Sequence, residues 1–319
     1  MNIPRGREDV ARLFQNSISR GKLSQAYIIN APSGMGKKTV TQYILSLIVC
    51  SSHSSCGVCP SCQSLEAKCH PDVVYLRRDE DKASLGVENV RAIKTEVYTR
   101  PVMSDYKVIV AEEMHLATVG AQNAMLKIIE EPPQNVVFIM LCDTLSPILP
   151  TILSRSVVVD LKPLSKEALS CIQGADDFLV SVSEGNPGKL TKLIEDADYT
   201  AFRDEVADAF FSLEDKDPYA PYRAAQRLDK FKTKSDEVFS LMLICARDAY
   251  FFKQGITDRI VNKDKLNYIS SFASSLTPDK LWSIMDIIIK TIGEKGPSGN
   301  FTMAVTILLL KCRSVRRKE

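Results

Sequence analysis

The sequence predicts a parallel-sheet α/β domain followed by two smaller helical domains, and three observations carry this prediction. Short β-branched runs alternate with helical patterns over the first 160 residues, as in a parallel sheet covered by helices. Beyond Pro163 the apolar residues follow a helical spacing instead. At 319 residues the chain is also too long for one compact core. We therefore expect an α/β domain at 1–163, a small helical domain at 164–204 and a larger helical domain at 205–319.

The expected strands are short, apolar and rich in β-branched residues, as strands buried on both faces are; they lie at 26–30, 73–76, 107–111, 136–141 and 157–161. Helical patterns lie between them at 38–49, 88–98 and 120–130, and the last ends at Pro132 and Pro133. Further helices are expected at 166–172, 188–194 and 202–213, with a turn at 184–188. From residue 205 onward no segment has the pattern of a strand.

The composition is that of an ordinary globular protein, with 45% hydrophobic and 25% charged residues. The 41 Lys and Arg nearly cancel the 39 Asp and Glu, so nucleic acid would have to be bound by a local basic patch. The first residues lack the apolar region of a secretory signal, and no apolar stretch is long enough to span a bilayer. We expect a cytoplasmic protein with no membrane partner, whose nine cysteines are reduced.

A glycine-rich segment, A-P-S-G-M-G-K-K-T at 31–39, joins the first expected strand to the first expected helix. This is the context of a P-loop, in which backbone N–H groups and the helix N-terminus surround a phosphate and a lysine reaches the outer phosphates. The expected ligand is therefore ATP or ADP. Its expected contacts are Ser33, Gly34, Gly36, Lys37, Lys38 and Thr39.

Two positions of this loop depart from the P-loop pattern. The leading glycine is replaced by Ala31, a change that is tolerated where the backbone keeps a negative φ. The second departure is the more serious one. The hydroxyl residue that should follow Lys37 and bind Mg²⁺ is replaced by Lys38. A cation about 4 Å from Mg²⁺ costs several kcal/mol at an effective dielectric of about 20, so Lys38 is expected to point away from a metal. Thr39 does not take its place, because one step along a helix turns the side chain by about 100°. We expect phosphate binding without efficient Mg²⁺-dependent hydrolysis.

Two acidic residues, Glu112 and Glu113, follow the expected strand at 107–111. The carboxyl end of a central parallel strand lies at the ligand-binding edge of such a sheet. In P-loop ATPases the first acid holds Mg²⁺ and the second orients the attacking water. Glu112 is one methylene longer than the usual Asp, whereas Glu113 fits the water-activating role.

Four closely spaced cysteines, Cys50, Cys56, Cys59 and Cys62, have the C-x-x-C spacing of a tetrahedral zinc site. Four protein ligands leave no open position for catalysis, so the zinc is expected to be structural. The fourth ligand is Cys50 or a substitute from nearby, and the candidates are His53, Cys69 and His70.

Two later segments carry a resemblance to a known family: G-A-Q-N-A-M-L-K-I-I-E-E-P-P at 120–133 and L-P-T-I-L-S-R-S at 149–156. They are similar to the N-A-L-L-K-x-L-E-E-P-P and I-L-S-R-C motifs of the bacterial clamp-loader ATPase family. The resemblance implies an AAA+ P-loop domain with a four-cysteine zinc module at 50–70, then a small helical lid domain and an all-α collar domain. In the family the first gap of that module is longer than here.

Within the family the chain looks more like the delta-prime subunits than the gamma/tau motor subunits. The segment G-K-L-S-Q-A-Y at 21–27 is similar to the delta-prime opening, and the basic sensor expected after the small-domain turn is replaced by Gly188. The sensor at the end of the fourth strand, usually a hydroxyl, is Cys142 followed by Asp143. The resemblance implies that Arg155 acts in trans on a neighbour's nucleotide. It also implies a hetero-oligomer with gamma/tau and delta subunits of the DNA polymerase III holoenzyme, which places a sliding clamp on primed DNA.

Two other interpretations stay open. One is a competent ATPase motor of the gamma/tau type, in which the purified chain hydrolyses ATP and Lys37→Ala abolishes turnover. The other is a zinc-dependent nucleic-acid adaptor, in which chelation of the metal abolishes DNA binding by the isolated chain. The few aromatic residues and the low basic charge around the cysteines speak against the adaptor.

Overall fold

The computed structural model describes residues 2–293 and 300–317. The chain divides into two compact units. The first consists of Met1–Gln173 with Ser183–Thr191, and the second of Gly174–Val182 with Lys192–Glu319. The finer division into three domains with boundaries near 163 and 204 stays a prediction.

The first unit contains a five-stranded parallel sheet with the order β2-β3-β4-β1-β5. The strands are β1 (Ala26–Asn30), β2 (Val73–Leu76), β3 (Lys107–Ala111), β4 (Val136–Cys142) and β5 (Val157–Asp160). The first three have the predicted bounds, the fourth is one residue longer, and the fifth is one residue shorter. The prediction of a parallel α/β domain is confirmed. The order places the carboxyl ends of β1, β3 and β4 side by side, where ligands bind in open α/β sheets.

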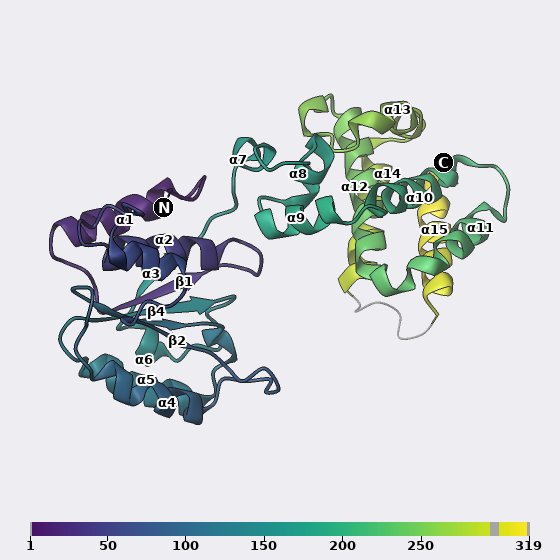
Figure 1. Ribbon diagram of the computed structural model, residues 1–319. Coiled ribbons are helices and arrows are strands. Elements are labelled where there is room, and N and C mark those ends of the chain that lie inside the picture. Colours follow the sequence, from purple (N-terminus) through teal and green to yellow (C-terminus); the bar gives the residue numbers. More distant parts are fainter. Residues whose placement is uncertain (1, 294–299, 318–319) are drawn as a thin grey trace. The chain divides into compact units, whose positions relative to one another are not determined.

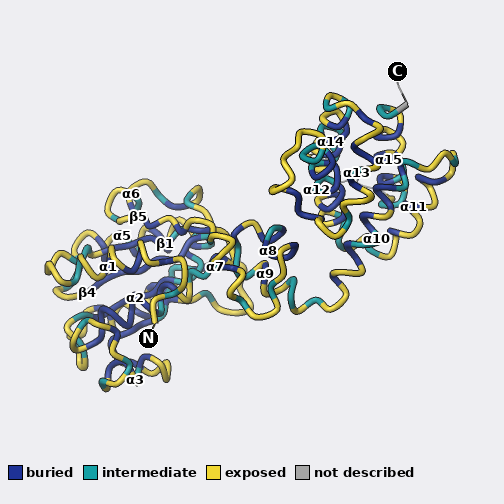
Figure 2. The backbone as a smooth tube through the Cα atoms, turned by 90° about the horizontal axis from the view of Figure 1, so that it is seen from above, coloured by how far each residue is buried: buried dark blue, intermediate teal, exposed yellow. Residues whose placement is uncertain are grey.

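Helices cover both faces of this sheet (Figure 1). One face carries α1 (Glu8–Ser19) and α2 (Lys37–Val49), and the other carries α4 (Val87–Val97) and α5 (Val119–Glu130). Alternate strand residues point to opposite faces, so Ile29 packs in the core with α1 and α2 and Ile28 in the core with α4 and α5. Figure 2 shows the four strands β1 to β4 mainly in the buried colour, whereas β5 at the edge of the sheet is mostly exposed.

The predicted helices of this unit form within a residue or two of their expected bounds. α2 begins one residue early, and α4 and α5 each begin one residue before the predicted start. The shorter α7 (Lys166–Ser170) and α9 (Pro187–Glu195) match the predictions at 166–172 and 188–194. The sequence did not predict α1, α3 (Pro60–Glu66) or α6 (Pro150–Leu153).

In the second unit every regular element of the described residues is a helix, as predicted. The α-helices are α8 (Asp177–Ser183), α10 (Tyr199–Phe211), α11 (Ala220–Leu228), α12 (Ser235–Lys253), α13 (Leu266–Ser274), α14 (Pro278–Gly293) and α15 (Phe301–Arg317). Short 3-10 helices lie at Ser212–Glu214, Asp229–Lys234, Thr257–Arg259 and Lys263–Lys265. α12 packs against α10, α13 and α14, and the fully buried rings of Phe210, Phe239 and Phe272 belong to this core.

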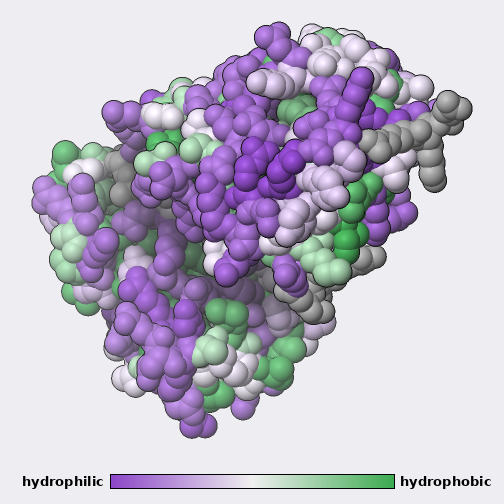
Figure 3. All heavy atoms as spheres, turned by 90° about the vertical axis from the view of Figure 1, so that its right-hand side faces the viewer, coloured by the Kyte–Doolittle hydropathy of each residue, from purple (hydrophilic) through white to green (hydrophobic). Residues whose placement is uncertain are grey.

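None of the helices in the described part of the chain is long and apolar enough to cross a membrane. Figure 3 shows one face of the molecule, on which hydrophilic side chains predominate and hydrophobic ones form small patches.

Candidate functional site: a phosphate loop and a four-cysteine cluster

The loop between β1 and α2 folds as a glycine-dependent turn. Gly34 has φ 83° and Gly36 has φ 82°, a left-handed conformation that residues with a Cβ adopt at a cost. The loop lines a pocket of about 350 Å³ at the carboxyl ends of β3 and β4. All the predicted nucleotide contacts and both predicted acids line it, together with two further residues: Ser33, Gly34, Gly36, Lys37, Lys38, Thr39, Glu112, Glu113, Leu141 and Asp143.

The phosphate-loop lysine, Lys37, is folded back onto its own loop. Its Nζ donates to the carbonyl oxygens of Ala31 at 2.6 Å and Pro32 at 3.1 Å. The same ammonium lies 2.6 Å from Asp143 Oδ1, and only 12% of the side chain is exposed. The sequence placed Asp143 at the end of β4 but did not predict this ion pair. Lys37 is therefore fully partnered by protein groups.

The residue at the metal-ligand position, Lys38, pairs with the acid at the metal-binding strand end. Lys38 Nζ lies 2.9 Å from Glu112 Oε2, and Arg77 Nη2 lies 3.0 Å from Glu112 Oε1. Burial alone would raise the pKa of Glu112, but the hydrogen bond and charge of Lys38, with those of Arg77, outweigh it and lower the pKa. The sequence predicted that Lys38 points away from a metal at this position, whereas the structure places its ammonium against the carboxylate of Glu112.

The donors at this position do not fit Mg²⁺. The ion needs near-octahedral oxygen ligands at about 2.0–2.1 Å. Glu112 has a cation on each of its oxygens, and Lys38 supplies an ammonium where a hydroxyl would bind the metal. At the end of β4, burial raises the pKa of Cys142 to about 12, so this residue holds a neutral thiol.

The second acid, Glu113, is held by an arginine. Its carboxylate lies 2.8 Å from Arg78 Nε, and its backbone has φ 51°, which is uncommon for a residue with a side chain. The ion pair engages one of the two carboxylate oxygens. The water-activating role of Glu113 stays a prediction.

A turn far along the chain closes over the phosphate loop. Gly188 N–H donates to Gly34 O at 2.9 Å, and Asn186 Nδ2 donates to Ser33 O at 2.9 Å. A Cβ added to Gly188 would lie 2.6 Å from Gly34 Cα, so no side chain fits there. The close packing of the two glycines therefore holds the turn at 184–188 against the phosphate loop. From the other side Arg7 Nη2 donates to Met35 O at 2.8 Å. Neither Arg7 nor Asn186 was predicted.

The predicted trans-acting arginine, Arg155, lies on the surface after α6. Its Nη1 donates to Thr151 O at 3.2 Å, and its Nη2 lies 3.1 Å from Glu130 Oε1. The two side chains are 43% and 41% exposed. An exposed ion pair of this kind is worth about 0–1 kcal/mol, so Glu130 does not prevent the guanidinium from reaching another acceptor.

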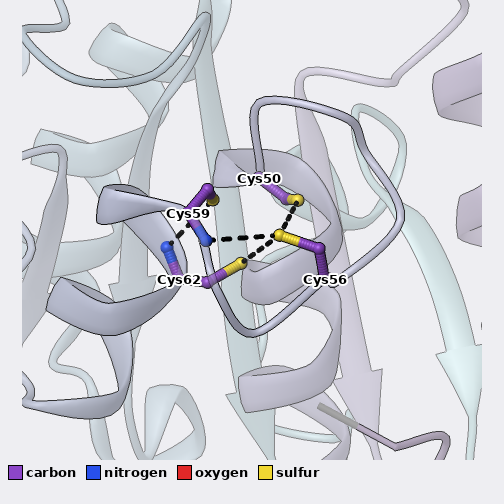
Figure 4. Close-up of side chains that lie close together, drawn as sticks. All are labelled: Cys50, Cys56, Cys59 and Cys62. Carbon is purple, nitrogen blue, oxygen red and sulfur yellow. Dashed lines mark hydrogen bonds between the residues drawn. The ribbon is translucent and has the colours of Figure 1, made fainter.

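The four predicted zinc ligands point toward one another (Figure 4). Cys50 follows α2, and Cys59 begins α3, in whose first turn Cys62 lies. All four sulfurs lie within 4.8 Å of one another, with Cys50 to Cys56 at 3.6 Å and Cys56 to Cys62 at 4.0 Å. Four sulfurs bound to a tetrahedral zinc at about 2.3 Å lie about 3.8 Å apart. These separations are close to that spacing, so the cluster could hold a zinc ion.

The surroundings of the sulfurs also suit a metal. Cys59 N–H donates to Cys56 Sγ and Cys62 N–H to Cys59 Sγ, each at 3.4 Å. Such bonds orient thiolate ligands. The candidate substitutes for Cys50 do not belong to the cluster. His53 contacts Leu47 O and Asp105, Cys69 donates to Ser64 O, and His70 Nδ1 accepts from Asp72 N–H.

The thiols of the cluster differ in acidity. Burial disfavours the Cys50 thiolate, but hydrogen bonds from Ser52 and from nearby backbone groups outweigh it and lower its pKa to about 5. Burial, with the neighbouring thiols, raises the pKa of Cys62 to about 12. A bound divalent cation would stabilise all four as thiolates.

Together the fold and the site define a P-loop-type α/β protein whose loop is engaged by its own side chains. A family model described as "DNA polymerase III, delta subunit" matches residues 6–165, which is half of the chain. Another, described as "DNA polymerase III, delta subunit, C terminal", matches residues 199–313. The chain belongs to this family of DNA polymerase III clamp-loader subunits, as its motifs predict.

Individual relatives point to the same family. The chain is 27% identical to DNA polymerase III subunit delta' of Escherichia coli (strain K12) over 282 residues, covering 84% of this chain and 82% of that protein. It is 35% identical to subunit gamma/tau of Mycobacterium tuberculosis (strain H37Rv) over 157 residues, which are 47% of this chain. The match spans only 26% of the length of that gamma/tau protein.

Among solved structures, a gamma subunit-related protein of Thermotoga maritima aligns over 98% of this chain and all of that chain. Its identity is 18% and its TM-score 0.44, values that support no conclusion about function.

Proposed function

We propose that this chain is a delta-prime-type subunit of a clamp loader, which supplies Arg155 to a neighbouring motor subunit and does not efficiently hydrolyse ATP itself. The observation that carries the proposal is the Lys38–Glu112–Arg77 network. It engages both oxygens of the acid that would hold Mg²⁺. Without the metal, the phosphate loop lacks the charge that stabilises phosphoryl transfer.

The exposed position of Arg155 supports its role in trans. Arg155 lies just after α6 with its side chain 43% exposed, and its partner Glu130 is itself exposed. An arginine that enters a neighbour's site stabilises the charge of the transferring phosphoryl group and can be worth about 10³–10⁵ in rate.

The second unit supports the proposed assembly with gamma/tau and delta subunits. α14 and α15 pack against each other, yet each also exposes apolar residues. Trp282 and Ile289 lie seven residues apart on α14, and Met303, Ile307 and Leu310 follow a helical spacing on α15. Exposed stripes of this kind mark protein–protein contact surfaces. They suit a helical collar in which several subunits associate.

A basic groove between α4 and α5 supports contact with primed DNA. The groove has a volume of about 340 Å³, and Arg91, Lys94 and Lys127 line it with no acidic residue among its lining. Tyr98 and Asn123 add polar groups. Such side chains bind phosphates without reading sequence, which suits a subunit that holds DNA while a sliding clamp is placed on it.

The four-cysteine cluster is proposed to hold a structural zinc. Four thiolates complete the coordination of the ion, so no position is open for a substrate. The zinc would tie the end of α2 to the start of α3 and so close the excursion that follows the phosphate-loop helix.

Reconstitution with gamma/tau, delta, the sliding clamp and primed DNA tests the proposal. Arg155→Ala should sharply lower the DNA-stimulated ATPase of the assembly while the subunits still co-elute, because Arg155 acts on chemistry and not on association. Arg12→Ala, which removes another exposed arginine, is the matched control. An ATPase rate unchanged by Arg155→Ala would contradict the trans-acting role.

The gamma/tau-like motor remains a second candidate, because the chain is 35% identical to the Mycobacterium tuberculosis gamma/tau subunit over 157 residues. It requires turnover by the purified chain that stops on Lys37→Ala.

A further inference from the structure

At the phosphate loop, the ammonium group of Lys38 lies where an ordinary P-loop site holds a metal ion. In an ordinary P-loop site a hydroxyl and an acidic residue hold Mg²⁺, and the ion bridges the acid and the phosphates. Here the ammonium of Lys38 lies 2.9 Å from the acid, Glu112, and lines the same pocket as the loop. It therefore has the position from which a cation can contact both groups.

The hydrogen-bonding capacity of Lys38 allows this bridge. An ammonium has three N–H donors, and in the structure its one carboxylate partner is Glu112 Oε2. The side chain is 75% exposed, so its remaining donors face solvent, where a phosphate oxygen can accept from them. Glu112, by contrast, is only 13% exposed and serves as the fixed end of the bridge.

The charge balance supports the same conclusion. Lys38 and Arg77 together bring two positive charges to Glu112, which is the charge that Mg²⁺ would bring. A metal entering the site would have to displace both cations from the carboxylate. The loop keeps Lys37 and the left-handed Gly34 and Gly36, the groups that contact phosphates.

We propose that this loop binds the polyphosphate group of a nucleoside di- or triphosphate without Mg²⁺, with Lys38 bridging Glu112 and the phosphate oxygens. This inference rests on the proposed non-hydrolysing role, and it adds that the site takes a metal-free nucleotide and holds it unreacted. The present partners of Lys37, which are two loop carbonyls and Asp143, are exchanged for phosphate oxygens on binding.

Calorimetric titration of the full chain with ADP, once with excess Mg²⁺ and once with EDTA, tests the inference. The dissociation constants under the two conditions should agree within about twofold. Lys37→Ala should weaken binding about tenfold or more in both, since hydrogen bonds to charged groups are worth about that factor.

Lys38→Thr restores the hydroxyl of the ordinary loop and is the decisive variant. It should bind ADP about tenfold more weakly than the wild type in EDTA and recover on addition of Mg²⁺, because Glu112 then needs another cation. Lys22→Thr, which removes the same charge from an exposed position, should bind as the wild type does.

Three results would overturn the inference: wild-type binding that falls tenfold in EDTA, a Lys38→Thr variant indifferent to Mg²⁺, or no ADP binding under either condition. None of these three results bears on the role of Arg155, so each would leave the proposed function intact. Steady ATP hydrolysis by the purified wild-type chain with Mg²⁺ would instead contradict the proposed function.

Discussion

The contact between Gly188 and the phosphate loop can be tested by adding a single methyl group. In Gly188→Ala the new Cβ would lie 2.6 Å from Gly34 Cα and 2.8 Å from Gly34 O. An ordinary contact is about 3.5–4.0 Å, so the turn at 184–188 has to move away from the loop. This movement also lengthens the hydrogen bond from Gly188 N–H to Gly34 O, now 2.9 Å.

The expected cost follows from three terms. Overpacking costs about 1–3 kcal/mol, and loss of one backbone hydrogen bond costs about 1 kcal/mol. The higher helix propensity of alanine returns up to about 1 kcal/mol at the start of α9. The free energy of unfolding should therefore fall by about 1–3 kcal/mol. For a unit of this size, that lowers Tm by roughly 3–9 °C.

Differential scanning calorimetry of Gly188→Ala measures this directly. Lys189→Ala is the matched control, because its side chain is exposed and its N–H still donates to Asn186 Oδ1 at 3.0 Å. The control should change the free energy of unfolding by less than about 0.5 kcal/mol. A Gly188→Ala variant that unfolds at or above the wild-type temperature would refute the packing argument.

Two further variants test the zinc cluster and a buried carboxylate. The wild type should purify with about one zinc per chain, and Cys59→Ala should lose most of it by elemental analysis; an equal zinc content in the variant would count against the cluster as the site. Asp72→Asn should lower the stability in urea at pH 7 by about 2–3 kcal/mol, because the buried carboxylate accepts from the N–H groups of Val102, Met103 and Ser104. Burial would raise the pKa of Asp72, but these bonds outweigh it and lower the pKa. The stabilisation is therefore present above the unfolded pKa of about 4 and lost as the pH falls through the lower folded pKa. A difference between Asp72→Asn and wild type that persists undiminished in acid would contradict this assignment.

Much of the first unit could be predicted because four of its five strands, β1 to β4, are almost entirely buried. Runs such as Val136–Cys142 are apolar throughout, so their bounds show in the sequence to within a residue. The helix α1 was missed although its pattern is present in the sequence. Its buried residues Val10, Ala11 and Phe14 share one helical face, and Ile18 packs against the same core.

The residue types of the site could be predicted, but their pairing could not. Local spacing identified Lys37, Lys38 and Glu112, whereas their partners Asp143 and Arg77 lie just beyond the ends of β4 and β2 and carry no motif that predicts the pairing. The orientation of Lys38 depends on which group lies beside it, a metal or a carboxylate. The spacing of residues in the sequence does not predict that neighbour. The contact of Gly188 with Gly34 spans 154 positions and depends on the absence of a side chain.

The central claim is that this chain's arginine, and not its own phosphate loop, contributes to ATP hydrolysis. The most direct test compares Arg155→Ala with Lys37→Ala, each in the reconstituted assembly, by steady-state DNA-stimulated ATPase. Arg155→Ala should lower the rate about tenfold or more, because it removes transition-state charge stabilisation from a neighbouring site. Lys37→Ala should leave the rate unchanged. The opposite pattern, a loss with Lys37→Ala and none with Arg155→Ala, would contradict the account.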